Sequence, residues 1–196
     1  HELRNPIAGM ITKLEVELSD PEPDPRERER VLNSLLSDTE RLENIVVDLL
    51  ELARLESDVA EEREPVDMCA LVREEFSERH RRIVPSVHTF GEAWVTGSRV
   101  RLVRLLTNLV SNAERHAKSR IEVVVDHDGD DVVIEVHDDG AGVPESERER
   151  IFERFSRLDE SMERDPEVSG LGLFISREIA QAKGGRLVAG RSDLLG

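Results

Sequence analysis

The chain has 196 residues, enough for one large or two modest domains, and carries 43 acidic against 27 basic side chains, a formal charge of −16. This balance argues against a protein that coats nucleic acid, because a phosphate backbone is bound by a basic surface. With 38% hydrophobic and 36% charged residues, the composition is that of a globular chain with a strongly charged surface.

The cysteine content and the longest apolar runs exclude further classes. The single cysteine, Cys69, rules out a disulfide framework, and no Cys/His spacing is typical of a zinc site. No apolar run approaches the roughly 18 to 20 residues needed to cross a bilayer, and we expect no signal peptide in these residues. We therefore expect a soluble chain in a reducing compartment. Because it begins at His1 without a methionine, we also expect it to be a piece of a longer protein.

The first elements predicted are two helices joined by a proline-rich turn. Apolar residues recur three and four apart from Leu3 to Leu18, which predicts a helix ending at Ser19 and Asp20, before the prolines. Asp24 and Pro25 are typical of an N-cap and a first helical position. A second helix is therefore predicted to begin at Pro25.

The second helix carries an apolar face wider than a two-stranded coil requires. Leu35, Leu42 and Leu49 are seven residues apart, and a parallel series runs from Leu32 to Ala53. This face suits a bundle of about four helices, of which the hairpin supplies half. We expect a homodimer to complete it, with a hairpin packed on its own second domain as the alternative.

A domain boundary is predicted near residue 62, where the patterning changes, and the second part is predicted to be α+β. Cys69 is expected in its core rather than as a reactive thiol. The predicted elements, in order, are a helix over Met68–His80, short strands around Gly91 between Val84 and Val95, a helix over Ser98–Ala117, a hairpin of Ile121–Val125 and Val132–Val136, an irregular segment over Gly140–Ser169, a helix over Leu171–Lys183 and a strand over Arg186–Val188.

Three elements of this second part point to an anionic ligand. Asn108 and Asn112 lie four apart on one helical face, with Arg115 and His116 in the next turn. Amide oxygens can bind a hard cation such as Mg²⁺, and the basic side chains can meet phosphate oxygens.

The other two elements are glycine turns. Asp138–Gly142 follows a strand, and its glycines permit close backbone approach. Gly170–Gly172 enters a helix whose first amides can hold phosphate. Each element alone also fits a solvated surface or an ordinary turn, so their order and spacing together carry the prediction.

With these residues in place, the sequence resembles the sensor histidine kinases of two-component signalling over nearly the whole chain. The resemblance rests on a phospho-acceptor motif, an N box, a first glycine box, an F box and a second glycine box, found in the family's order. In this chain they are His1–Pro6, Asn108–Ala113, Asp138–Gly142, Ile151–Phe155 and Gly170–Leu173.

The resemblance implies an α+β architecture in two domains. Residues 1–61 would form a dimerising, antiparallel helical hairpin, half of a four-helix bundle, that serves histidine phosphotransfer. Residues 62–196 would form an α/β-sandwich ATP-binding domain of the Bergerat type. The first helix would normally begin before His1, and the last strand of the domain is expected to be missing.

In the hairpin, the resemblance implies that His1 takes the γ-phosphoryl group of ATP. Glu2 would orient the ring and accept its proton. Asn5 would position water in a phosphatase reaction on the partner's phosphoaspartate. Pro6 is expected to bend the helix beside the acceptor.

In the second domain, the resemblance assigns Asp138 to the adenine amino group and Asn112 to Mg²⁺, supported by Asn108. Basic residues of the helix and of a mobile lid would contact the phosphates. With the glycine boxes, the remaining ATP-binding residues are Arg115, His116, Gly140, Gly142, Arg154, Arg157, Gly170, Leu171 and Gly172.

The implied function is ATP- and Mg²⁺-dependent phosphorylation of His1, followed by transfer to an aspartate on a response-regulator receiver domain. The chain would be cytoplasmic, without nucleic-acid partners, and tethered to the membrane only through upstream segments. One alternative is an ATPase of the same fold, as in gyrase or Hsp90-type proteins. Those use a glutamate where this chain has Asn108, which favours transfer. Another is a non-catalytic dimeric scaffold, supported only by Val168 at a position where the family usually has glycine.

Overall fold

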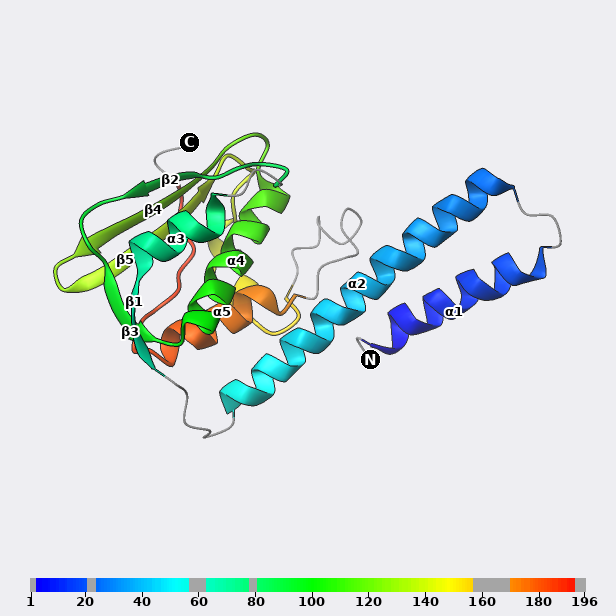
Figure 1. Ribbon diagram of the computed structural model, residues 1–196, viewed down its shortest axis with the longest axis horizontal. Helices are drawn as coiled ribbons and strands as arrows, with labels where there is room; N and C mark the ends of the chain where they lie inside the picture. Colours follow the sequence, from blue (N-terminus) through cyan, green and yellow to red (C-terminus); the bar gives the residue numbers. More distant parts are fainter. Residues whose placement is uncertain (1–2, 21–23, 57–62, 78–80, 157–169, 193–196) are drawn as a thin grey trace.

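The computed structural model describes residues 3–20, 24–56, 63–77, 81–156 and 170–192. Two helices, α1 (Arg4–Ser19) and α2 (Pro25–Glu56), form an antiparallel hairpin that projects from a compact α/β domain (Figure 1). Both predicted helices are present, and α1 ends and α2 begins where the sequence predicts. The predicted cap is present as well, because the Asp24 carboxylate accepts the Arg26 amide at 3.0 Å.

The hairpin is held by buried apolar residues and by polar contacts between its two helices. Leu35 and Ile45 of α2 are buried. Lys13 Nζ of α1 donates to Ser34 Oγ at 2.8 Å and to Asp38 Oδ2 at 2.6 Å. A second apolar face stays exposed along both helices, and it comprises Ile7, Ile11, Leu14, Leu18, Leu32, Leu36, Val46, Val47 and Leu50.

The strands of the second domain form two sheets. Strands β1 (Glu64–Asp67) and β3 (Trp94–Gly97) pair antiparallel. Strands β2 (Ser86–Thr89), β4 (Ile121–Asp128) and β5 (Asp131–Asp138) form a sheet in the order β2-β4-β5, with β2 parallel to β4. The predicted hairpin of β4 and β5 is confirmed, and its turn contains Gly129 at φ +64°.

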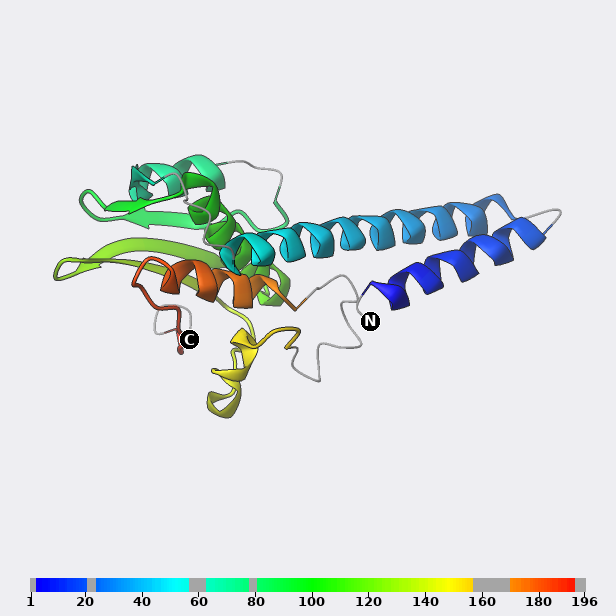
Figure 2. The ribbon, with the colours of Figure 1, turned by 90° about the horizontal axis from the view of Figure 1, so that it is seen from below.

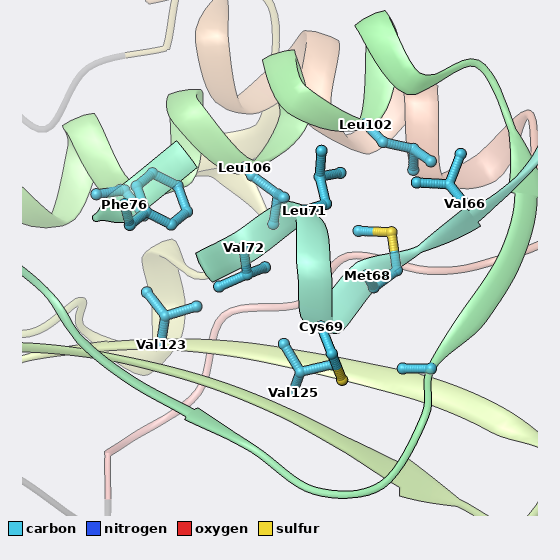
Figure 3. Packing of buried hydrophobic residues seen from close by; sticks show 12 residues of the cluster. Val66, Met68, Cys69, Leu71, Val72, Phe76, Leu102, Leu106, Val123 and Val125 are labelled. Carbon is cyan, nitrogen blue, oxygen red and sulfur yellow. The ribbon is translucent and has the colours of Figure 1, made fainter. Parts of the chain in front are cut away.

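Three α-helices accompany these sheets among the described residues: α3 (Met68–Phe76), α4 (Arg99–His116) and α5 (Gly172–Gln181) (Figures 1 and 2). Leu71 and Val72 of α3 lie between α4 and the inner face of β4 (Figure 3). Cys69 is buried in the same core, and burial raises the pKa of its thiol. Leu171, Ile175 and Ile179 of the α5 region form a second buried cluster.

The structure also corrects parts of the prediction. The helix predicted over Met68–His80 ends at Phe76, since residues 77–80 add no apolar side chain. The strand predicted over Arg186–Val188 is wrong: in the described chain, residues 186–192 form no strand. A strand needs backbone partners, and β5 pairs only with β4 among the described strands. Strand β1 and the short 3-10 turns η1 (Glu145–Glu147) and η2 (Arg150–Phe152) were not predicted.

Candidate functional site

The polar face of α4 meets the second glycine turn. Asn108 is half-buried, and its Nδ2 donates to the carbonyl oxygen of Gly172 at 3.1 Å. A Cβ at Gly172 would lie 3.5 Å from the Asn108 side chain, in ordinary van der Waals contact, so the two positions are direct neighbours. Asn112, one turn later, is also half-buried. The predicted pair therefore lies on the side of α4 that carries the contact to the start of α5.

Close packing also explains the first residues of the second glycine box. Gly170 has φ +70°, and a Cβ there would lie 3.0 Å from the backbone of Phe155. Its carbonyl accepts the Phe155 amide at 3.0 Å. Leu171 is fully buried, and Ser176 Oγ donates to the Gly172 carbonyl at 2.9 Å. The turn is thus anchored by one apolar side chain while its backbone faces α4.

The other glycine turn closes against the last residue of α4. The Asp138 carboxylate accepts the Gly140 amide at 2.8 Å. A Cβ at Gly140 would lie 2.5 Å from Asp138 Oδ1 and 2.6 Å from the His116 carbonyl oxygen. Gly142 has φ +73°. Position 140 therefore requires glycine for steric reasons, and position 142 favours it for conformational ones.

Asp139 has a role that the sequence reasoning missed. Its carboxylate accepts the amides of Lys118, Ser119 and Arg120 at 2.8 to 3.2 Å, and the Ser119 hydroxyl at 2.7 Å. These hydrogen bonds, the Ser119 amide first and then its hydroxyl, hold the pKa of Asp139 far below its usual range. Asp139 thereby fixes the loop between α4 and β4 against the turn after β5. The sequence signal that could have indicated this role is that Asp139 directly follows Asp138, a candidate ligand-binding residue.

The basic residues assigned to the ligand lie at the rim of this region. Arg115 and His116 are exposed in the last turn of α4. Arg154, in the predicted F box, stacks on the Phe174 ring of α5 at 4.8 Å. Phe155 beside it has φ +60°, an uncommon backbone conformation for a side-chain-bearing residue.

Several predicted residues fall outside what the structure describes. His1, Glu2, Arg157 and Val168 lie outside the described residues. Asn5 belongs to α1, but its side chain is not described. The structure therefore brings together the α4 residues and the two glycine turns, and leaves the acceptor residues and Arg157 as sequence predictions.

The histidines outside the candidate site include His88, His127 and His137, whereas His80 lies outside the described residues. His127 is exposed, and its Nε2 lies 2.7 Å from the Glu92 carbonyl oxygen. His88 and His137 line a hollow of about 510 Å³ on the outer face of the sheet, away from the inner core. Among the described residues, no three His, Cys, Asp or Glu side chains are placed to hold a metal ion. No helix of the described ranges is long and apolar enough to span a membrane.

Comparison with known families accounts for both parts of the chain. Residues 1–58 match the His Kinase A (phospho-acceptor) domain. Residues 97–194 match the family described as histidine kinase-, DNA gyrase B-, and HSP90-like ATPase. A phospho-acceptor hairpin joined to an ATP-binding α/β domain defines the catalytic core of a phosphotransfer protein. The chain belongs to the sensor histidine kinases of two-component signalling.

Individual relatives agree with this membership. The probable sensor histidine kinase TcrY of Mycobacterium tuberculosis is 33% identical over 98% of this chain and 42% of its own length. The sensor protein CutS of Streptomyces coelicolor is 36% identical over 96% of this chain and 47% of its own length. The chain thus spans about half the length of the curated relatives it matches.

Solved structures show the same fold. Histidine kinase ThkA, in complex with response regulator protein TrrA, has a TM-score of 0.76 at 25% identity. That match covers 98% of this chain and 56% of the other. The Acinetobacter baumannii histidine kinase AdeS has a TM-score of 0.67 at 23% identity, covering 93% of this chain and 86% of that one, and it supports the fold alone.

Proposed function

We propose that this chain is the catalytic core of a homodimeric sensor histidine kinase that phosphorylates itself on His1 with Mg·ATP. The observation that carries the proposal is the convergence of three motifs: Asn108 contacts Gly172, and the Asp138 turn closes on His116 at the end of the same helix. A nucleotide bound between the two turns would have its adenine at Asp138 and its phosphates toward α5. The hairpin supplies the acceptor.

The residues assigned to ATP suit its chemistry. The Asp138 carboxylate accepts hydrogen bonds, as recognition of an adenine amino group requires. Arg115, His116, Arg154 and Arg157 would offset phosphate charge in a chain of formal charge −16. Phosphoryl transfer depends mainly on positioning and on neutralising charge, which is what such a set of donors and cations provides.

The donor set also fits a magnesium ion. The Asn112 amide oxygen is a hard ligand on a half-buried turn of α4, with Asn108 one turn away. We assign Asn112 as the protein's ligand and Asn108 as its support. When bound, the ion neutralises phosphate charge during transfer.

Imidazole is suited to the acceptor role because one ring nitrogen can attack while the other carries a proton. Glu2 would orient the ring and accept that proton. Asn5 lies one helical turn from His1 in the sequence and would position water for dephosphorylation of the partner. The phosphatase role is part of the proposal and rests on the family resemblance.

The proposed function implies two protein partners for this chain. A second copy of the chain would cover the exposed apolar face of the hairpin. A response-regulator receiver domain would take the phosphoryl group onto an aspartate, and the resemblance to ThkA, solved with a response regulator, supports this. In the whole protein, segments outside this chain would supply the sensor and a membrane anchor.

The test is incubation of the full-length protein with γ-labelled ATP. Wild type is expected to gain an acid-labile label, and His1→Gln is expected to gain none while binding nucleotide normally. Asp138→Asn should lose both nucleotide binding and label. His88→Gln, which changes an exposed strand histidine, is the matched control and should be labelled like wild type. Label surviving in His1→Gln would refute the acceptor assignment.

A further inference from the structure

Two ion pairs join the hairpin to the ATP-binding domain. Arg104 Nη2 lies 2.6 Å from Asp48 Oδ1, and Arg101 Nε lies 2.9 Å from Glu51 Oε1. The two carboxylates are three positions apart on α2, and the two guanidinium groups are three positions apart on α4. Each pair of side chains therefore shares one helical face, and the ion pairs form two adjacent rungs between the helices.

These ion pairs are buried. The Asp48 and Glu51 side chains are 12% and 8% exposed, and those of Arg104 and Arg101 are 20% and 16% exposed. Arg54, at 3.9 Å from Glu51, is 75% exposed and belongs to α2 itself. Removing one member of a buried pair leaves an unpaired charge out of water, so the geometry of the junction depends on both members.

Apolar side chains of α2 reinforce the same junction. Leu49 and Leu55 pack against the buried cluster that begins with Leu171. Leu171 directly follows Gly170 of the second glycine turn, and Arg104 lies one helical turn before Asn108. The hairpin therefore contacts α4 and α5 next to the residues assigned to the nucleotide.

The ATP-binding domain has a definite orientation relative to the hairpin (Figures 1 and 2). Both views show α5 with its first turn at the end nearer to the beginning of α1 (Figures 1 and 2). This first turn follows the second glycine turn. His1 precedes α1 in the sequence, so the N-terminal end of α1 is the acceptor end of the hairpin.

We propose that Asp48–Arg104 and Glu51–Arg101 are positioning pairs for phosphoryl transfer. They hold the ATP-binding domain on the hairpin so that the nucleotide faces the acceptor end of α1. This inference rests on the proposed kinase function. Both pairs act by orienting one domain on the other, and none of the four residues is assigned to ATP or to His1.

A charge exchange in the full-length protein tests this role. Arg104→Asp and Asp48→Arg are each expected to lower kcat of autophosphorylation about 10- to 100-fold, because misplacement of reacting groups by about 1 Å has that effect. The dissociation constant for ATP should stay within about twofold, because the nucleotide residues are intact. The double variant, which restores opposite charges at the junction, should recover most of the lost kcat.

The control uses another ion pair of the same helix. Arg99 Nη2 lies 2.8 Å from Glu74 Oε2, within the ATP-binding domain and away from the hairpin. Arg99→Asp should change neither kcat nor ATP affinity. Should Arg104→Asp fail to fold, Arg104→Gln removes the charge with a smaller perturbation and is measured in the same way, with the melting temperature as a check.

The outcomes separate this inference from the proposed function. Wild type that gains no label on His1 would refute the kinase assignment itself. With an active wild type, the positioning role is overturned by single variants whose kcat is unchanged or higher, by loss of ATP binding in Arg104→Asp, or by a double variant no faster than the slower single variant.

Discussion

The two regions of the molecule differ in how they bury their apolar side chains. In the ATP-binding domain, Leu71, Val72, Leu106 and Val110 are fully buried within the single chain. In the hairpin, large apolar side chains along both helices are exposed, and Leu36, for example, is 59% exposed. The ATP-binding domain therefore buries its core within a single chain. The hairpin, in contrast, leaves an apolar face that a further surface is needed to cover.

The size of that unpaired face makes a second copy the natural occupant. Fully burying one leucine or isoleucine side chain stabilises a protein by about 1.5 to 3 kcal/mol. The exposed hairpin residues recur along both helices, as in half of a four-helix bundle. In the part of the chain that the structure describes, the end of α2 is covered by α4 and α5, and this outward face is not.

The largest expected effect comes from placing a charge in the exposed hairpin face. Leu36→Glu should weaken self-association about 100-fold or more, because burying an unpaired carboxylate costs several kcal/mol. Sedimentation velocity measures the shift from dimer to monomer. ATP binding should be unchanged, since Leu36 is remote from the nucleotide residues in the sequence and belongs to the hairpin.

The control is Arg30→Glu, at an exposed position of α2 on a different side of the helix from Leu36. This variant should remain dimeric. A Leu36→Glu protein that associates as tightly as wild type would show that this face is not the dimer surface.

The next effect concerns the ATP-binding domain alone. Gly140→Ala should lower ATP affinity about tenfold or more, since its Cβ would collide with Asp138 Oδ1 and the His116 carbonyl oxygen. Gly190→Ala is the matched control, because a Cβ there meets no atom within 4 Å. Calorimetric titration with ATP compares them. Equal affinities for the two variants would remove Gly140 from the site.

The smallest effect is on acid stability. Because the pKa of Asp139 is lower in the folded chain than in the unfolded chain, its contribution to stability is complete above the ordinary carboxyl pKa of about 4. It is lost as the pH falls through the lower, folded-state value. Asp139→Asn should therefore melt below wild type at neutral pH, with a gap that narrows in acid.

Asp130→Asn, at an exposed position of the β4–β5 turn, is the control for this measurement. Its melting temperature should follow that of wild type at every pH. A gap for Asp139→Asn that is constant with pH would mean that its ionised form is not what stabilises the turn.

The periodicity of apolar residues in the sequence was sufficient to predict the long helices and strands. Helices α1, α2 and α4 and the β4–β5 hairpin follow from apolar spacing that is sustained over many residues. Strand β1 has four residues, one of them Pro65, and such a short run gives no periodic signal. The wrong strand at Arg186–Val188 shows the reverse case, in which a β-rich run lacks a partner among the described strands.

The sequence was sufficient to predict the motifs of the site. It was not sufficient to predict the hydrogen bonds and ion pairs between residues that are distant in the sequence. Asn108, Asp138 and the glycine turns were visible because each is a short local pattern. The clamp of Asp139 joins residues about 20 positions apart, and the ion pairs of α2 with α4 join residues 50 and 56 positions apart. Such contacts depend on the tertiary fold, for which a charged residue in a chain that is 36% charged gives no distinct signal.

In the proposed function, the ATP-binding domain transfers the γ-phosphoryl group of ATP to the hairpin rather than to water. The most direct measurement follows ADP release and phosphorylation of the His1 peptide together, by mass spectrometry at alkaline pH, in the full-length protein. Phosphoryl groups on His1 are expected to appear in step with ADP during the first turnover. Release of ADP and inorganic phosphate with no modification of His1 would contradict it and would favour an ATPase of the same fold.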